Sequence, residues 1–342
     1  MEERVTFESD GLKLSGVLHL PEARGVRRAA FLVLHGFGSN KDGSGGKAMA
    51  AMLTRLGYTA LRFDFRGCGE SQGERGRVIC KEQVRDTRNA ASFLAGRGDI
   101  QPQRIGVIGQ SFGAAVAVYA AGVDRRIAAC ISSGGWGDGA KKFRKQHASP
   151  RAWAKFRAMM REGKRRKRSG RPMMVPRYDI VPIPPRLRGN LAPDSIMEFP
   201  FEVVESMYEF NANEVVGRIA PRPLLLLHSA SDSVTPTEQS VELFERAGKP
   251  TDLHLIADVD HFMFSEGNTL ILNLVRNWLD KHSTGGVIQP ARIALANKYD
   301  LSHAHSAFVA MCDADPSTPG TCKMDGAGDI GCTEYLRHDA SV

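Results

Sequence analysis

The chain has 342 residues, of which 42% are hydrophobic and 25% are charged, so it is long enough to bury the core of a globular protein. No stretch approaches 18 unbroken apolar residues and the N-terminus MEERVTFESD is polar, which excludes a membrane-spanning helix and predicts a cytoplasmic location. Six cysteines without a CxxC pair indicate reduced thiols rather than a disulfide framework.

Short apolar runs alternate along the chain with amphipathic segments of helical length. This alternation is typical of an α/β fold with a mostly parallel, doubly wound sheet. Strands are predicted at residues 14–18, 29–34, 59–63, 105–108, 128–131, 224–227 and 253–256. Helices are predicted at residues 47–56, 82–95, 112–121, 240–247 and 268–281, and a glycine follows each of the first four, as expected at a helix C-terminus.

The regular alternation stops between residue 133 and about residue 216, where prolines, arginines and methionines replace it. Residues 136–190 contain 17 Lys or Arg against 3 Asp or Glu, although the net charge of the whole chain is only +8. So basic a region is expected either to face an anion or to form a solvated helix surface. We expect residues 1–133 and 216–282 to form one core, residues 134–215 to be a basic insertion, and residues 283–342 to be a C-terminal tail of unknown role.

A single serine stands between two glycines in GQSFG, residues 109–113, where a predicted strand gives way to a predicted helix. Small residues at Gly109 and Gly113 permit the sharp turn that exposes a nucleophilic serine at the carboxyl end of a sheet. The helix N-terminus also places free N–H groups beside a developing oxyanion. The pattern favours Ser111 as a nucleophile, and the alternative is that its side chain only caps the helix.

A serine nucleophile needs a base, and His261 in DVDHF follows the predicted strand 253–256 at the same edge of the sheet as Ser111. His35 also follows a strand, but it precedes the serine in the chain and is interpreted as a structural histidine that holds a loop. His228 ends a strand only four residues before the best candidate acid, too close to be oriented by that acid across a cleft.

The acid that orients the histidine is predicted to be Asp232 in LLLLHSASDSVTP, just past a strongly apolar strand. Asp258 and Asp260 are alternatives, but near neighbours of His261 in a tight loop rarely turn a carboxylate onto the ring Nδ1. The three residues then follow the order serine, acid, histidine along the chain, unlike the orders of trypsin and subtilisin.

With these motifs the chain resembles the α/β-hydrolase family over residues 5–282. The resemblance is carried by HGFGSNKD at 35–42, FDFRGCGESQG at 63–73, GQSFG at 109–113, PRPLLLLHSASDSVTP at 221–236 and DVDHF at 258–262. The HGF and RGCGES segments resemble small-molecule serine esterases of the cinnamoyl (feruloyl) esterase and dienelactone-hydrolase-like type. The resemblance implies that the backbone N–H groups of Phe37 and Phe112 form the oxyanion hole and that the insertion is a cap over the active site. Asp64 and Arg66 are interpreted as a structural pair that holds their loop.

No cofactor or metal is indicated by the sequence. The glycine-rich stretch GSGGK at 43–47 lacks the first glycine and the Ser or Thr that a phosphate-binding P-loop requires. Cys312, Cys322 and Cys332 in the tail do not have the spacing of a zinc site. Nucleic acid is not expected as a partner, because the basic run 161–171 has no interleaved aromatic residues.

We therefore predict a serine hydrolase that cleaves a carboxylic ester of a small or medium acyl group through an acyl-enzyme on Ser111, with Trp136 and Phe262 as candidate pocket residues. One alternative is a thioesterase or acyltransferase, including one for acyl-CoA, that uses the same residues, since the basic insertion would attract phosphate or carboxylate groups. A second alternative is a non-catalytic hydrolase fold that binds a ligand or a protein partner. The sequence does not predict an oligomeric state.

Overall fold

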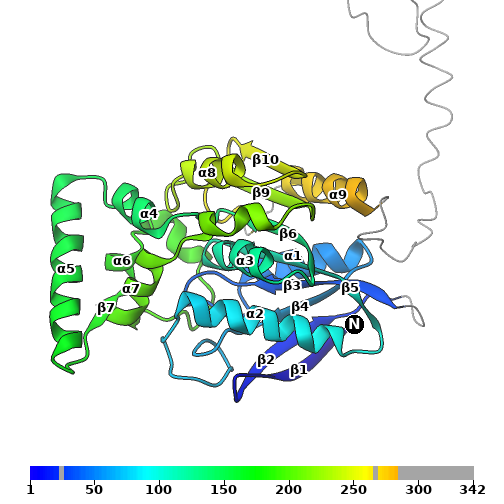
Figure 1. Ribbon diagram of the computed structural model, residues 1–342, viewed down its shortest axis with the longest axis horizontal. Coiled ribbons are helices and arrows are strands. Elements are labelled where there is room, and N and C mark those ends of the chain that lie inside the picture. The colour runs from blue at the N-terminus through cyan, green and yellow to red at the C-terminus, as the bar shows by residue number, and fades with distance from the viewer. Residues whose placement is uncertain (23–26, 265–268, 284–342) are drawn as a thin grey trace, which may run out of the picture. The chain divides into compact units, whose positions relative to one another are not determined.

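The computed structural model describes residues 1–22, 27–264 and 269–283. Within these ranges the main sheet has eight strands in the order β1-β2-β4-β3-β5-β6-β9-β10 (Figure 1). Strands β1 and β2 pair antiparallel, β2 pairs antiparallel with β4, and every pairing from β4 to β10 is parallel. The strands are β1 Glu2–Ser9, β2 Leu12–His19, β3 Arg28–Leu34, β4 Thr59–Phe63, β5 Ile100–Gln110, β6 Ile127–Ser133, β9 Leu224–Ser229 and β10 Thr251–Ile256.

Helices cover both faces of this sheet (Figure 1). Successive side chains of a strand point to opposite faces, so an apolar strand has hydrophobic side chains to bury on both. On β3, Phe31 and Val33 belong to the apolar cluster that contains residues of α1 and α9. Leu32 and Leu34 belong to the opposite cluster, with residues of α2, α3 and α8. The predicted fold class, an α/β protein with a doubly wound, mostly parallel sheet, is confirmed. The covering helices are α1 Ser44–Arg55, α2 Cys80–Ala95, α3 Phe112–Val123, α8 Glu238–Arg246 and α9 Thr269–Ser283.

The insertion, residues 134–215, lies between β6 and β9 and is mainly helical. Figure 1 shows α5 at its outer edge, with α4, α6 and α7 between α5 and the main sheet. Two short strands, β7 and β8, pair antiparallel within it. Its elements are α4 Gly139–Gln146, α5 Pro150–Arg168, β7 Met174–Pro176, α6 Arg177–Ile180, η1 Pro185–Asn190, β8 Glu198–Pro200, α7 Phe201–Glu209 and η2 Ala212–Glu214, and η3 Val216–Arg218 follows.

The seven predicted strands coincide with β2 to β6, β9 and β10, but β1 was not predicted. Strand β1 lies at the edge of the sheet and exposes every second side chain, so its sequence EERVTFES contains no apolar run. Asp10 and Gly11 form the turn to β2 with φ values of +50° and +80°. An Asp-Gly pair favours the tight turn of a β-hairpin, so this pair alone predicts a strand before β2.

In the described part of the chain, no helix is both long enough and apolar enough to cross a membrane. The expected tail, residues 283–342, lies outside the described residues beyond Ser283, and so do its three cysteines.

Candidate active site

Ser111 occupies the turn between β5 and α3, with a backbone φ of +56° and ψ of −118°. Such a conformation strains any residue with a side chain and persists only where the surroundings fix it. Both flanking glycines are required by close packing: a Cβ on Gly113 would lie 2.5 Å from the carbonyl oxygens of Leu34 and His35, and a Cβ on Gly109 would overlap the Gly113 carbonyl. The Ser111 side chain makes no capping hydrogen bond to α3.

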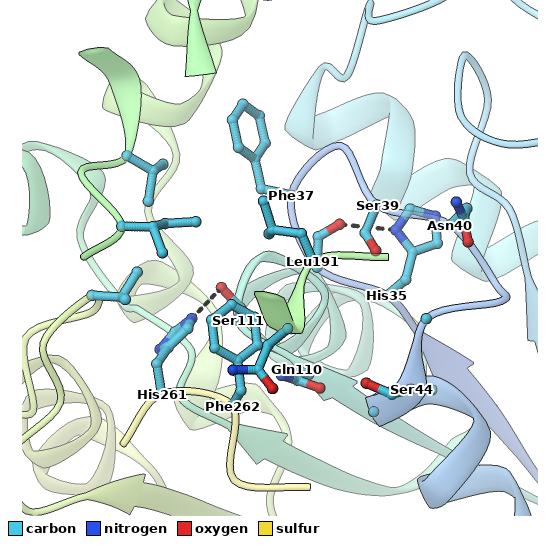
Figure 2. A pocket seen from close by; sticks show the side chains of 18 of the residues that line it. His35, Phe37, Ser39, Asn40, Ser44, Gln110, Ser111, Leu191, His261 and Phe262 are labelled. Carbon is cyan, nitrogen blue, oxygen red and sulfur yellow. Dashed lines mark hydrogen bonds between the residues drawn. The ribbon is translucent and has the colours of Figure 1, made fainter. Parts of the chain in front are cut away.

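The structure brings the side chains of Ser111, His261 and Asp232 together at the carboxyl edge of the sheet. His261 Nε2 lies 2.8 Å from Ser111 Oγ, and His261 Nδ1 lies 2.8 Å from Asp232 Oδ2. Figure 2 shows His261 turned toward the serine. An ionised carboxylate only accepts hydrogen bonds, so Nδ1 carries the ring proton and Nε2 is left to accept the hydroxyl proton. This is the geometry that a general base requires.

Asp232 is buried in the turn that follows β9. The backbone N–H groups of Val234 and Thr235 each donate to its Oδ1 at 2.7 Å. Burial acts to raise the pKa of Asp232, but the charge interaction with His261 and the hydrogen bonds from His228 and His261 outweigh burial and hold the pKa well below its usual value. Asp232 is therefore ionised at neutral pH.

His228 and His35, the competing histidines, are both buried, and His228 also contacts the candidate acid, with Nε2 3.3 Å from Asp232 Oδ2. His228 is fully buried beside Asp232, with Nε2 3.0 Å from the Thr235 carbonyl and Nδ1 2.6 Å from Ser240 Oγ. His35 Nε2 accepts the N–H of Phe65 at 3.2 Å, and Nδ1 donates to the Gly36 carbonyl at 2.9 Å. Burial lowers the pKa of His35, so its ring is neutral. His35 thus ties two loops together, as its interpretation as a structural histidine anticipates.

The competing acid Asp260 binds backbone amides of the two loops at the site and the side chain of Arg186. Its Oδ1 accepts the backbone N–H of His261 at 2.8 Å and that of Ser233 at 2.9 Å, and Arg186 lies 2.5 Å from its Oδ2. Asp260 therefore shapes the loop that carries the histidine, while Asp232 contacts the ring.

The backbone N–H groups of Phe37 and Phe112 are among those near Ser111 that have no hydrogen-bond acceptor in the described part of the chain. Phe112 is the first residue of α3, and the first amides of a helix lack an intrahelical acceptor. Phe37 follows His35 and Gly36 after β3, and its ring centroid lies 5.9 Å from that of Phe112. Both amides are thus available to an external oxygen atom.

A cavity of about 60 Å³ lies beside Ser111 (Figure 2). Its wall combines the loop after β3, the first residues of α1, the turn around Ser111, the histidine loop and part of the insertion. The lining residues include His35, Gly36, Phe37, Ser39, Asn40, Gly43, Ser44, Gly45, Gly46, Met49, Gln110, Ser111, Arg177, Val181, Ile183, Asn190, Leu191, Val234, His261 and Phe262.

Of the two predicted pocket residues, Phe262 lines this cavity and Trp136 does not. The Trp136 side chain is buried in the hydrophobic core, where its ring packs against Phe112 and Phe210 with centroid distances of 5.8 Å and 6.4 Å. The prediction for Trp136 is therefore corrected: its apolar surface is used in packing beneath the site.

The sequence analysis missed the contribution of α6 and η1 to the cavity wall. Arg177 on α6 lines the cavity, donates to the carbonyls of Phe37 and Gly38, and donates to the Ile196 carbonyl at 2.6 Å. The N–H of Ile196 also donates to the Gly38 carbonyl at 2.8 Å. These contacts hold the insertion against the loop that carries Phe37. They join residues far apart in the chain, so no local sequence pattern signals them.

The basic run 161–171 does not line the cavity. It covers the end of α5, where Glu162 pairs with Arg165 and Arg166 at 2.7 Å each and Lys167 pairs with Glu205. Among the described residues, Arg177 is the only Lys or Arg that lines the cavity. The run 161–171 is thus separate from the cavity.

The predicted pair between Asp64 and Arg66 is wrong. Asp64 Oδ2 lies 3.1 Å from Lys41 Nζ. Arg66 binds Asp86 at 2.6 Å and Asp10 at 2.8 Å. Asp64 and Arg66 therefore do not bind each other. Asp64 binds the loop that carries Lys41, and Arg66 binds α2 and the turn after β1.

Comparison with known proteins agrees with this fold. The family model described as serine aminopeptidase, S33, matches residues 25–268. The thiohydrolase aneE of Aspergillus aculeatus is 28% identical over 74% of this chain and 83% of its own. The polyketide transferase grgF of Penicillium sp. is 26% identical over 80% of this chain and 94% of its own. The structure of Est1E from Butyrivibrio proteoclasticus with bound ferulic acid has a TM-score of 0.60, with 17% identity over 82% of this chain and 99% of its own. Since the family model covers well over half of the residues, the chain belongs to the serine aminopeptidase S33 family of α/β hydrolases.

Proposed function

We propose that the chain is a serine hydrolase that cleaves a carboxylic ester of a small or medium acyl group through an acyl-enzyme on Ser111. The observation that carries this proposal is the hydrogen-bonded series from Ser111 Oγ to His261 Nε2 and from His261 Nδ1 to Asp232, with 2.8 Å at each step. A serine that only caps a helix has no need of a buried base and an ionised acid.

The reaction proceeds in two halves. His261 Nε2 takes the hydroxyl proton as Ser111 Oγ attacks the ester carbonyl, and the protonated ring then gives that proton to the leaving alcohol. Water repeats the sequence on the acyl-enzyme, which releases the acid and restores the serine. Asp232 holds the ring and stabilises its positive charge in both halves.

The negative charge that develops on the carbonyl oxygen needs fixed hydrogen-bond donors. The N–H groups of Phe37 and Phe112 are without acceptors among the described residues and flank the serine in the chain fold, so they are the donors we assign to the oxyanion hole. Arg177 supports the Phe37 loop from the insertion, which acts in this mechanism as a cap over the site.

A second candidate function is cleavage or transfer of a thioester with the same residues. It is favoured by the names of two relatives, a thiohydrolase and a polyketide transferase, that align with most of this chain. An acyl-enzyme on Ser111 is common to both functions, and exclusion of water from the cavity would favour transfer over hydrolysis.

The test is turnover of p-nitrophenyl esters from acetyl to decanoyl, beside acetyl-CoA and longer acyl-CoA thioesters, by the wild type and by Ser111→Ala. We expect ester turnover by the wild type and a loss of about 10³-fold or more in the variant. Ser132→Ala is the matched control, because Ser132 is fully buried on the neighbouring strand and its hydroxyl has no partner among the described residues.

Covalent labelling distinguishes a protein without catalytic activity from an enzyme that does not accept the tested substrates. A fluorophosphonate is expected to add its mass to the wild type at Ser111 and to leave Ser111→Ala unlabelled. A folded wild-type protein that neither turns over any of these substrates nor reacts with the probe would contradict the catalytic proposal and favour a binding role.

A further inference from the structure

One side of the cavity beside Ser111 carries several polar residues and is called the polar side, although Leu191 also lies there in Figure 2. Figure 2 shows Ser39, Asn40, Ser44 and Gln110 on the side of Ser111 away from His261. Apolar residues also line the cavity, and they come from the insertion, the loop after β9 and the histidine loop. They are Val181, Ile183, Leu191, Val234 and Phe262.

The polar side is built on the N-terminus of α1, a helix of 12 residues. Its N-cap residue Gly43 supplies no side chain to cap the helix, and its first turn contains no acidic residue. Gly43, Ser44, Gly45 and Gly46 all line the cavity, so the positive end of the helix dipole faces the space beside the serine. Helix N-termini of this kind bind anionic oxygen atoms.

Gln110 gives a second and independent indication of a ligand. Its side chain lines the cavity, and only 7% of the residue is exposed. An amide in a cavity wall can donate a hydrogen bond to a carboxylate oxygen of a bound ligand. Gln110 directly precedes Ser111, so a group bound to it is part of a molecule held at the serine.

The charge of the cavity wall selects the kind of ligand. Arg177 lines the cavity, is 2% exposed and lies within salt-bridge distance of no acidic side chain in the described ranges. Its guanidinium hydrogen-bonds only to carbonyl oxygens, and its Nε has no partner there. The described lining residues include no Asp or Glu. A buried positive charge without a counter-ion is unfavourable, and a negatively charged ligand would offset that cost.

We infer that the polar side of the cavity binds a carboxylate carried by the acyl group of the substrate, so that the preferred substrates are half-esters of dicarboxylic acids. This inference rests on the proposed function, because His261 must protonate the leaving group and so fixes that group on its own side of Ser111. The acyl group then extends to the opposite side, toward Gln110 and the N-terminus of α1.

The first test compares matched substrates that differ only in charge. Monoethyl succinate, glutarate and adipate are paired with ethyl butanoate, pentanoate and hexanoate, and ethyl 5-amino-5-oxopentanoate supplies a neutral polar analogue of the glutarate. We expect kcat/KM for the best half-ester to exceed that of its neutral partners by about 10- to 100-fold, as for hydrogen bonds to a charged group. Equal values across all three pairs would overturn the inference.

The amide is tested with Gln110→Leu against Gln83→Leu. Gln83 is fully buried with an unpartnered amide in the described part of the chain, but it lies on α2 and does not line the cavity. Gln110→Leu is expected to lower the ratio of kcat/KM for the half-ester to kcat/KM for ethyl pentanoate about 10-fold, whereas Gln83→Leu leaves this ratio unchanged. An equal loss for charged and neutral esters in Gln110→Leu would contradict carboxylate recognition.

The helix N-terminus is tested with Gly46→Asp against Gly46→Asn. A Cβ at Gly46 meets no atom closer than 3.7 Å, so both side chains fit, and an acid in the first turn favours the helix. The aspartate is expected to bring the ratio of kcat/KM between half-ester and neutral ester to about 1, and the asparagine of equal size is expected to keep the wild-type ratio. A preserved preference in Gly46→Asp would overturn the assignment of α1.

Binding to Ser111→Ala separates this inference from the proposed function. Glutarate is titrated calorimetrically into Ser111→Ala and into the double variant that adds Gly46→Asp. Binding that the aspartate abolishes supports the carboxylate site even where the wild type hydrolyses no ester. Hydrolysis of neutral esters without any binding of glutarate keeps the proposed function and overturns the carboxylate site.

Discussion

At Asp232, burial and charge act in opposite directions on a single carboxyl group. The group is buried, yet its pKa lies below the usual value because His261 and His228 surround it. Replacement by asparagine would retain the shape of the side chain but remove the charge, and its amide would present a donor where His261 Nδ1 needs an acceptor. We therefore expect this substitution to lower kcat much more than it lowers the free energy of unfolding.

We expect Asp232→Asn to lower kcat for ester hydrolysis by about 10⁴-fold, because the asparagine favours the wrong tautomer of His261. Steady-state kinetics with a p-nitrophenyl ester measures this loss. Asp260→Asn is the control, since Asp260 accepts hydrogen bonds from the backbone amides of His261 and Ser233, and a smaller loss is expected there. A larger loss in Asp260→Asn would exchange the two assignments.

The same carboxyl group predicts how stability depends on pH. A folded pKa below the unfolded value of 3.8 contributes stability that is fully present above that pH and is lost as the pH falls toward the folded pKa. The difference in free energy of unfolding between the wild type and Asp232→Asn should thus be constant at neutral pH and narrow below pH 3.8. Urea unfolding at a series of pH values measures the difference, and a constant difference down to pH 3 contradicts this account.

At Lys142 on α4, burial is the dominant influence on the pKa. Its Nζ lies 4.4 Å from the ring centroid of Trp136 and 4.2 Å from that of Phe143, without a hydrogen-bond partner in the described ranges. Burial lowers the pKa of Lys142 to about 7 from 10.5. The unfolded chain therefore binds more protons between these two values, and the folded state becomes more stable as the pH rises through that window.

We expect Lys142→Met to raise the free energy of unfolding by several kcal/mol at pH 7, because each pKa unit corresponds to about 1.4 kcal/mol. The gain should shrink toward pH 10, where the folded and unfolded lysines are both becoming neutral. Lys145→Met is the control, as Lys145 is exposed and pairs with Glu238 at the surface. A gain of equal size at pH 7 and pH 10 would refute the buried-charge explanation.

Among the elements, those with a clear periodic pattern were predicted and those defined by long-range contacts were not. Strands such as β3 and β9 are buried along their whole length, so their apolar runs are unmistakable. Helix α5 was missed although Phe156, Met160 and Gly163 repeat at helical spacing on its buried face. Many Lys and Arg residues surround these three positions, so the apolar periodicity is weak in the sequence.

That buried face of α5 gives a prediction about packing. Gly163 approaches Phe201 of α7 so closely that a Cβ would overlap the ring, and Phe201 is only 1% exposed. Alanine normally favours a helix over glycine by about 1 kcal/mol, but overpacking costs about 1–3 kcal/mol. We expect Gly163→Ala to lower the free energy of unfolding in urea, while Gly189→Ala, which meets no atom within 4 Å, does not. A higher free energy of unfolding for Gly163→Ala than for the wild type would show that the Phe201 ring can move to make room for the added methyl group.

For the molecule as a whole, the candidate triad could be predicted because each residue follows its own strand. Parallel strands end at the same edge of the sheet, so Ser111, Asp232 and His261 were expected to meet there. The cavity could not be predicted in the same way, since its wall depends on how the insertion packs. The contact of Arg177 with the Phe37 loop is an example that no local motif encodes.

The extent of the catalytic unit is itself testable by truncation. The family model ends at residue 268, and the described residues that line the cavity end at Phe262. Helix α9 lies beyond both limits, but its apolar side chains Ile271, Val275, Trp278 and Leu279 are buried in the cluster that covers one face of the sheet. The helix therefore belongs to the core, although it contributes nothing to the cavity.

A chain that ends at Ser283 should keep ester turnover within about twofold of the full chain, since it retains the cavity and α9. A chain that ends at residue 268 should fail to fold, because burying each large apolar side chain of α9 contributes about 1.5–3 kcal/mol and four of them approach the whole stability of a domain. Circular dichroism and ester kinetics on both chains measure this. A chain that ends at Ser283 and is folded but inactive would show that residues 284–342 are needed for catalysis.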